Sequence, residues 1–313
     1  EFARMIVPLT QYHLKSVLNL IGISTGKFYQ WAGRTGDENK HNGKIPKDNW
    51  LLDWEKDAII TYARKHPAEG YRRLTYMMMD DDIVAVSPST TYRVLKAAGL
   101  LNRWNAVKRS LKSNGFVQPS EIHQHWHVDI KYVNFKGSFL FLISVIDGFS
   151  RYIVHHELSM NMQEHEVQVT IQRALENHPG YHPRIISDNG SQFISKDFAA
   201  FMKLAGLQHL KTSVAYPQSN GKLERFRRTI HEECLMRSSM ITLEDARNQV
   251  QQFIGYYNTK RLHSSLYFLT PEDFFCNCID SKLQVRESKH ANAKILRQKA
   301  RSNDQSSTLL SHN

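Results

Sequence analysis

Three acidic residues in segments of different kinds could together carry phosphodiester chemistry. Asp129 lies in a strand-like run, Asp188 follows a short apolar run, and Glu224 lies in a segment with helical periodicity; 35 residues separate Asp188 from Glu224. Two divalent ions about 3.5–4 Å apart can activate an attacking oxygen and stabilise a leaving one. Mg²⁺ prefers oxygen ligands and keeps several waters, so two or three carboxylates suffice. The three acids therefore predict a two-metal site for a phosphodiester.

The strand-like run 126–133 predicts the direction of the Asp129 side chain. Its apolar residues alternate and share one face: Trp126, Val128, Ile130 and Tyr132. Alternation then points Asp129 to the other face, together with His127 and Lys131. Asp188 ends its own strand before an Asn-Gly turn, and ligands of open α/β sheets lie at the carboxyl ends of strands.

Glu224 is expected on an amphipathic helix. Its apolar residues recur at spacings of three, four and four, and they predict one buried face: Leu223, Phe226, Ile230 and Cys234. Glu224 lies about 100° around the helix from Leu223, so it can reach the sheet edge. Lys222, Arg225 and Arg228 would then approach DNA. Taken singly, each of the three acids could also be an ordinary turn or ion-pair residue.

Residues 121–275 predict an α/β domain. Three β-rich segments with short joins, 126–133, 138–146 and 151–158, are typical of an antiparallel meander. A helix, a short strand at 184–187, a second helix and a fifth strand at 207–211 follow. This order predicts a mixed five-stranded sheet flanked by helices, preceded by all-α domains.

Residues 1–35 predict a helix-turn-helix. Gly22 interrupts a helical pattern, and Ser24 can cap a second helix that carries Lys27, a candidate DNA contact. Any small helical hairpin would give the same pattern, so that alternative stays open.

Residues 36–104 predict a second helix-turn-helix unit after a polar linker. Ser87 and Pro88 signal a helix start, and Gly99 signals its end. The methionine run 77–79 is expected in the core. Three arginines in this unit are candidate phosphate contacts: Arg72, Arg73 and Arg93.

The charge of the chain favours a polyanionic partner. Lys and Arg number 41 against 30 Asp and Glu, giving a net charge of +11 and a pI near 9.5. A soluble basic protein is the plainer alternative. Residues 105–120 predict a basic linker that is either solvated or lies along DNA. Residues 276–313 predict a basic tail that can stay disordered until it meets DNA.

Other features exclude several classes of protein. An apolar share of 41% suffices for buried cores, and no apolar run of 18 residues predicts a membrane span. Three cysteines argue against a disulfide framework and for a reducing compartment. Cys276 and Cys278 lack further ligands at zinc-finger spacing, so a structural zinc site is not expected. No signal peptide is visible.

Five segments resemble the catalytic core of retroviral-type integrases and insertion-sequence transposases. They are 126–130 (Trp-His-Val-Asp-Ile), 146–151 (Ile-Asp-Gly-Phe-Ser-Arg), 187–193 (Ser-Asp-Asn-Gly-Ser-Gln-Phe), 216–225 (Tyr-Pro-Gln-Ser-Asn-Gly-Lys-Leu-Glu-Arg) and 257–266 (Tyr-Asn-Thr-Lys-Arg-Leu-His-Ser-Ser-Leu). This is the DDE superfamily with an RNase H-like fold, and the chain is similar to its IS3-type transposases in particular. The 35-residue spacing equals that of the family's D,D(35)E pattern.

The resemblance implies an activity and a cofactor. Asp129, Asp188 and Glu224 would hold two Mg²⁺ ions, with Mn²⁺ able to substitute. The enzyme would bind the terminal inverted repeats of an element, cut at their 3′ ends and join the 3′-hydroxyl directly to double-stranded target DNA. A homo-oligomer on DNA in the bacterial cytoplasm, associated with the nucleoid, would be expected, with no membrane partner.

The resemblance also implies a surface that approaches the DNA end. It would comprise five residues around the helix start: Tyr216, Gln218, Asn220, Lys222 and Arg225. Arg261 and His263 would extend it, and capping of a helix end is the alternative role for both.

Two other functions compete with this interpretation. The first is a different enzyme on the same fold, an RNase H or a junction resolvase. The second is a catalytically silent copy that acts as a DNA-binding repressor. All three acids are present, which favours the enzyme.

Overall fold

The computed structural model describes residues 7–33, 50–101, 118–211, 217–237 and 240–310, without the side chains of 217–220 and 303–310. The chain divides into two compact units, Glu1–Trp50 and Leu51–Asn313. The polar linker before residue 50 and most of the predicted basic linker 105–120 lie outside the described residues.

The first unit contains the helical pair predicted within residues 1–35. Its elements are η1 (Val7–Leu9), α2 (Leu14–Leu20) and α3 (Thr25–Ala32). Ser24 caps α3, because its hydroxyl accepts a hydrogen bond from the Lys27 amide at 3.3 Å. Gly22 turns the chain between the helices with φ +72°, a conformation that glycine adopts without steric cost.

A second helical group opens the larger unit. It consists of α4 (Asp53–Lys65), α5 (Tyr71–Asp80) and α6 (Pro88–Ala97). The Ser87 hydroxyl caps α6, Pro88 occupies its first turn, and Gly99 follows its end with φ +69°, as the sequence predicted. Met78 and Met79 are buried in its core, and Met77 packs against that core.

Five strands form one mixed sheet in the order β3-β2-β1-β4-β5. They are β1 (His125–Phe135), β2 (Ser138–Asp147), β3 (Ile153–Ser159), β4 (Arg184–Ser187) and β5 (His209–Lys211). The first three strands form the antiparallel meander, and β4 and β5 join β1 in parallel. The predicted mixed five-stranded sheet is confirmed.

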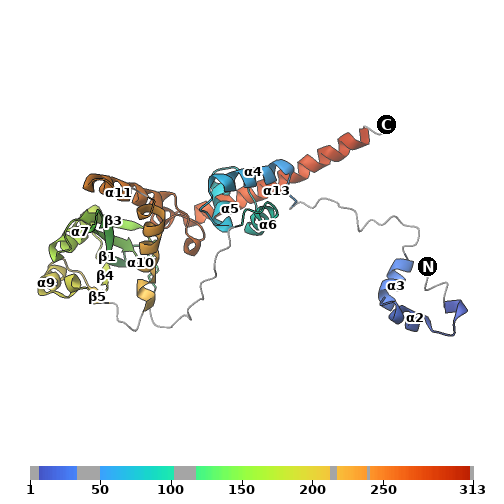
Figure 1. The fold of residues 1–313 in the computed structure, drawn as a ribbon, viewed down its shortest axis with the longest axis horizontal. Coiled ribbons are helices and arrows are strands. Elements are labelled where there is room, and N and C mark those ends of the chain that lie inside the picture. Colours follow the sequence, from blue (N-terminus) through green and yellow to red (C-terminus); the bar gives the residue numbers. More distant parts are fainter. Residues whose placement is uncertain (1–6, 34–49, 102–117, 212–216, 238–239, 311–313) are drawn as a thin grey trace. The chain divides into compact units, whose positions relative to one another are not determined.

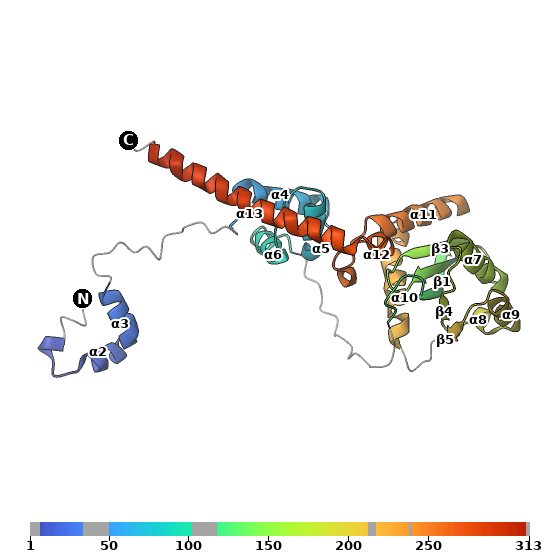
Figure 2. The ribbon, with the colours of Figure 1, turned by 180° about the vertical axis from the view of Figure 1, so that it is seen from behind.

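Helices cover both faces of the sheet. They are α7 (Glu164–Asn177), α8 (Ser191–Ile194), α9 (Lys196–Leu204), α10 (Pro217–Ile230), the π-helical turn η2 (His231–Leu235) and α11 (Leu243–Thr259). α7 and α9 lie on one side of the sheet, and α10 and α11 lie on the other (Figure 1, and from behind in Figure 2). Two cores result, one for each face.

The core beneath α7 and α9 confirms the predicted alternation along β1. Trp126 and Val128 are fully buried there, and Ile130 packs against the same cluster. The cluster ends at that point, so Tyr132, predicted on the same face, is 54% exposed.

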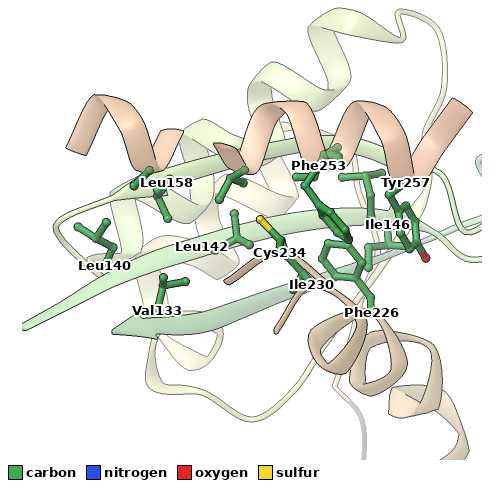
Figure 3. Packing of buried hydrophobic residues seen from close by; sticks show 14 of the residues in the cluster. Val133, Leu140, Leu142, Ile146, Leu158, Phe226, Ile230, Cys234, Phe253 and Tyr257 are labelled. Carbon is green, nitrogen blue, oxygen red and sulfur yellow. The ribbon is translucent and has the colours of Figure 1, made fainter. Parts of the chain in front are cut away.

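The core beneath α10 and α11 fixes the helix that carries Glu224. Figure 3 shows side chains of β1 and β2 packed against both helices. The predicted apolar face of α10 and its continuation into η2 is buried there: Leu223, Phe226, Ile230 and Cys234. With that face buried, Arg227 on the same helix contacts Asp129 on β1.

The C-terminal region corrects one prediction. After α11 come η3 (Ser264–Leu266), α12 (Pro271–Phe275) and α13 (Ile279–Leu310). Residues 276–313 were expected as a basic tail without regular structure, and this was wrong, because most of them form α13. Two of its arginines are buried in ion pairs with the helical group: Arg286 with Asp80 and Arg297 with Glu55. α13 runs beside α4 and α5 in both views (Figure 1, Figure 2).

Candidate active site

The sheet places Asp129 and Asp188 side by side, on one inner strand and at the end of its neighbouring inner strand. β1 and β4 are parallel neighbours, and the last pair of their ladder is His127 with Ile186. Continuing that register by two residues sets Asp129 beside Asp188. Asp129 lies within β1 and is 4% exposed, on the α10 face as predicted. Two chain segments far apart in sequence thus supply adjacent carboxylates.

A tight turn positions Asp188 directly after β4. Its carboxylate oxygen Oδ1 accepts a hydrogen bond from the Gly190 amide at 2.9 Å. A Cβ atom on Gly190 would stand 3.1 Å from that same oxygen, so a larger residue there would crowd the carboxylate. The Asp188 side chain remains 46% exposed and can accept a ligand from solvent.

Helix α10 carries Glu224 and brings an arginine to the two aspartates. Glu224 is exposed, next to the buried Leu223, as helical geometry predicts. Arg227 lies one turn further along. It donates hydrogen bonds to both carboxylate oxygens of Asp129, and its Nη2 lies 3.9 Å from Oδ2 of Asp188. The same guanidinium therefore contacts or approaches both aspartates.

The electrostatics of these groups are strongly coupled. Burial raises the pKa of Asp129 above its ordinary value, Arg227 opposes that shift, and the charge of Asp188 adds to it. Burial disfavours the charged form of Arg227, but its hydrogen bonds to Asp129 and the charges of Asp188 and Glu224 outweigh this and raise its pKa. All three acids thus act on one cation.

Two of the three carboxylates, those of Asp129 and Asp188, are placed so that they could bind a divalent cation. Carboxylate oxygens are the hard ligands that Mg²⁺ prefers, and Asp129 and Asp188 already attract a positive group between them. Within the described part of the chain, however, no three His, Cys, Asp or Glu side chains are grouped closely enough to hold a metal. The fit thus rests on the two aspartates, and Glu224 would have to turn inward to join them.

A second group of charges lies beside the first. The buried Asp147 accepts hydrogen bonds from the backbone amides of His123, Phe149 and Ser150, and it organises the turn after β2. Lys222 on α10 donates a hydrogen bond to the Gly148 carbonyl in this turn. Burial and then the charge of Arg151 lower the pKa of Lys222 to about 8.

Arg151 closes that turn with φ +63°, and burial lowers its pKa. None of the described acidic side chains pairs with it. Two other cations lie close enough to interact with it electrostatically: beyond the effect of burial, Arg225 lowers the pKa of Arg151, and Arg151 lowers the pKa of Lys222. Cations crowded together in a partly buried place favour an anion such as a phosphate.

The other predicted DNA contacts differ in accessibility. Arg72, Arg93, Arg225 and Arg228 are exposed, whereas Arg73 is partly buried in an ion pair with Glu69. In the first unit, the Lys27 ammonium lies over the Trp31 ring, 5.0 Å from its centroid. Tyr216 and the side chains of Gln218 and Asn220 lie outside the described residues.

Arg261 and His263 correct the prediction of an extended DNA surface. Both are buried, at 7% and 5% exposure, so neither forms part of an exposed face. Arg261 instead donates hydrogen bonds to both carboxylate oxygens of Glu233 at 2.6 and 2.7 Å. Burial and the neighbouring Arg261 hold the pKa of His263 well below its ordinary value. Their role in this structure is to join η2 to the segment after α11.

Two residues of the site were missed from the sequence. Arg227 lies three residues after Glu224, a spacing that puts both on the same side of a helix, and this was the available signal. Arg151 follows the turn segment 147–150, but nothing in the sequence indicated that its partly buried charge would act on Lys222 of α10.

The chain is similar to known integrase and transposase sequences. Two models described as integrase core domain match residues 119–217 and 205–271. The transposase for insertion sequence element IS904 from Lactococcus lactis is 30% identical over 176 residues, which are 56% of this chain and 67% of the relative. The chain belongs to the insertion-sequence transposases. The transposase is accordingly an enzyme of the DDE transposase and integrase type, and DNA transposition is its general function.

Further relatives and solved structures are similar over longer or shorter parts of the transposase. The transposase for IS629 from Shigella sonnei is 22% identical over 274 residues, 84% of this chain and 91% of the relative. The HTLV-2 integrase catalytic core domain in complex with magnesium is 18% identical with a TM-score of 0.40, covering 50% of this chain and 98% of that one. The simian T-cell lymphotropic virus intasome in complex with a PP2A regulatory subunit is 16% identical with a TM-score of 0.46, covering 70% and 74%. None of the transposase's described helices has the length and apolar character needed to cross a membrane.

Proposed function

We propose that this transposase, an IS3-type enzyme, cuts DNA at the 3′ ends of its element and joins each 3′-hydroxyl directly to target DNA. The observation that carries this proposal is the placement of Asp129 and Asp188 beside one guanidinium, that of Arg227, on a helix that also carries Glu224, whose charge acts on the same group. Three acids at this position suit phosphoryl transfer, because the substrate is anionic and its attacking oxygen is a weak nucleophile.

The three carboxylates would hold divalent ions. Asp129 and Asp188 would be ligands, and Glu224 would complete the set by turning its exposed side chain toward them. Bound Mg²⁺, or Mn²⁺ in its place, would polarise the phosphate and the attacking oxygen, and a pair of ions is the arrangement that direct strand transfer favours. Asp129 is held within β1 and Asp188 by the turn after β4, so both aspartates are positioned before any substrate binds.

Basic residues beside the acids would hold the DNA strand. Lys222, Arg225 and Arg228 lie on α10 on either side of Glu224, and Arg151 is close enough for its charge to act on Lys222. Their charges would pair with backbone phosphates near the scissile bond. Tyr216, Gln218 and Asn220 remain candidates for contacts with the DNA end.

The helical parts would bind the terminal repeats. Residues 1–35 and 36–104 are proposed as two DNA-binding units, 105–120 as a basic linker and 121–275 as the catalytic core. Joining two element ends in one reaction calls for at least two copies of the chain on DNA. We expect this assembly at the bacterial nucleoid.

A strand-transfer assay tests the function directly. A duplex carrying the element's own pre-cut end would be incubated with target DNA and Mg²⁺ or Mn²⁺. We expect joined products from the wild type, and a loss of at least about a thousandfold for Asp188→Asn, since a carboxylate ligand contributes several kcal/mol. Asp197→Asn, which neutralises an exposed acid on α9, is the matched control and should retain activity.

The same assay separates the competing functions. Cleavage without joined product would identify a nuclease, and binding without either reaction would identify a repressor. Undiminished joining by Asp188→Asn would contradict the assignment of that residue.

Binding at increasing salt tests the basic surface. Contact with six to ten phosphates should lower the affinity by about 10³- to 10⁵-fold between 50 and 200 mM salt. Arg225→Gln should reduce the slope of log affinity against log salt by about one, because one phosphate contact is lost. An unchanged slope would remove Arg225 from the interface.

A further inference from the structure

We propose that Arg227 is a displaceable internal cation that sets the metal affinity of the active site. Its guanidinium holds the carboxylates when no divalent ion is bound, and a divalent ion must displace it to bind. This inference rests on the proposed function, because it assumes that Asp129 and Asp188 are metal ligands.

The first support is the geometry of the ion pair. Arg227 Nε donates to one carboxylate oxygen of Asp129 and Nη2 donates to the other, so both oxygens are engaged. Nη2 also lies 3.4 Å from the Ile130 carbonyl and 3.9 Å from Oδ2 of Asp188. A planar guanidinium matches a carboxylate in this two-point arrangement. The position between the aspartates is therefore taken by a positive charge.

The second support is that Arg227 and a divalent ion exclude each other. A metal ligand must offer an oxygen lone pair toward the ion, and the side of Asp129 that faces Asp188 already accepts two N–H groups. Like charges a few ångströms apart in a partly buried site repel strongly even at an effective dielectric constant near 20. Arg227 must move before an ion can bridge the two aspartates.

The third support is that Arg227 is free to leave. Its side chain is 39% exposed, whereas Asp129 is 4% exposed. Helix α10 is anchored by its apolar face, and Arg227 takes no part in that core. The guanidinium can therefore swing into solvent while the helix stays in place, and the buried carboxylate passes from one cation to another.

Among the neighbouring cations, Arg227 is the one that competes with a divalent ion for the carboxylates of Asp129 and Asp188. Lys131 lies on the same face of β1, but no ion pair joins it to a described carboxylate, whereas Arg227 donates to both oxygens of Asp129. Arg228 is exposed and has no carboxylate partner among the described side chains. Replacement of Arg228 is thus a matched control for a change of one charge on the same helix.

Metal binding to the full chain without DNA tests the inference. Free and bound Mn²⁺ would be counted by electron paramagnetic resonance for the wild type, Arg227→Gln, Arg227→Lys and Arg228→Gln. We expect Arg227→Gln to bind Mn²⁺ about 10- to 100-fold more tightly than the wild type, since charge-assisted hydrogen bonds of this kind correspond to about that factor. Arg227→Lys should fall between them, and Arg228→Gln should change the affinity by less than about threefold.

Each outcome decides the question. A purely structural role for Arg227 would make its loss weaken metal binding, so equal or weaker binding by folded Arg227→Gln and Arg227→Lys overturns the inference. Arg227→Lys keeps a charge beside Asp129 and provides the answer if Arg227→Gln does not fold. Asp129→Asn tests the metal site separately from the role of Arg227. If this variant loses Mn²⁺ binding, the metal site is supported even if the Arg227 variants bind Mn²⁺ like the wild type. If no variant binds Mn²⁺ and the wild type does not bind it either, both the inference and the metal site fail.

Discussion

Two arginine–carboxylate pairs in this transposase look alike and differ in purpose. Arg297 and Glu55 are 4% and 3% exposed, and their hydrogen bonds of 2.8 to 3.0 Å are completed by the Ala85 carbonyl and the Leu52 amide. Arg227 and Asp129 form a pair that is open on the arginine side and has a second carboxylate nearby. We call the first pair sealed, because both of its side chains are buried, and the second open, because its arginine is partly exposed and can be replaced by another cation.

The difference shows that the burial of an ion pair, and how fully its polar atoms are hydrogen-bonded, decide the role of the pair. A sealed pair whose remaining polar atoms are all bonded is costly to break, because either partner alone would be a buried unpaired charge. A half-exposed pair is cheap to break, because its arginine can return to water. The sealed pair attaches α13 to the helical group, and the open pair leaves the acids available for other cations.

The largest effect is expected at the sealed pair. Glu55→Gln should destabilise the α4–α6 and α13 group by about 3–5 kcal/mol, since it leaves Arg297 buried without a counter-charge. Hydrogen exchange of peptides from α4 and α13 measures this as faster opening. Asp53→Asn on the same helix removes an exposed pair with Lys56 and should leave the exchange rates of α4 and α13 nearly unchanged. Equal effects of the two changes would show that burial does not distinguish these pairs.

An intermediate effect is expected at Glu233, which is partly buried beside Arg261. Burial works against its ionised form, but the hydrogen bonds from Arg261 outweigh this and lower the pKa of Glu233 below 4.5. The pair should therefore stabilise the protein above pH 4.5, and this contribution is lost as the pH falls through the folded-state pKa.

Glu233→Gln should accordingly cost about 1–3 kcal/mol at pH 7. Urea unfolding of both proteins between pH 7 and the acid range should show the difference shrinking as the pH falls. A difference that stays constant over this range would mean that the charge of Glu233 contributes nothing.

The smallest effect on stability is expected at the open pair. Asp129→Asn should change the stability by about 1 kcal/mol or less, because burial already disfavours the charged carboxylate and Arg227 can turn to Asp188 or to water. Thermal melting of the full chain, alone and with Mn²⁺, provides the measurement. Added Mn²⁺ should raise the melting temperature of the wild type and leave that of Asp129→Asn unchanged. A loss of 3 kcal/mol or more would make this pair a structural one like the sealed pair.

The sequence by itself determined the local structure and the position of the acids. Alternation along β1 predicted the face of Asp129, and spacings of three and four predicted the buried face that leaves Glu224 outward. Ser24 and Ser87 predicted two helix starts through their capping hydroxyls. These inferences hold because strands and helices repeat with fixed periods, so a short stretch of sequence carries the whole signal.

Only the tertiary structure decided which charges meet. Arg227 pairs with an acid 98 residues away and Arg297 with one 242 residues away, and no local pattern encodes either choice. Arg261 was predicted at the surface and is buried, and the basic C-terminal segment forms a docked helix. Long side chains on flexible stems find partners only after packing has set the burial and the distance of each group, which is why these outcomes could not be predicted from composition or period.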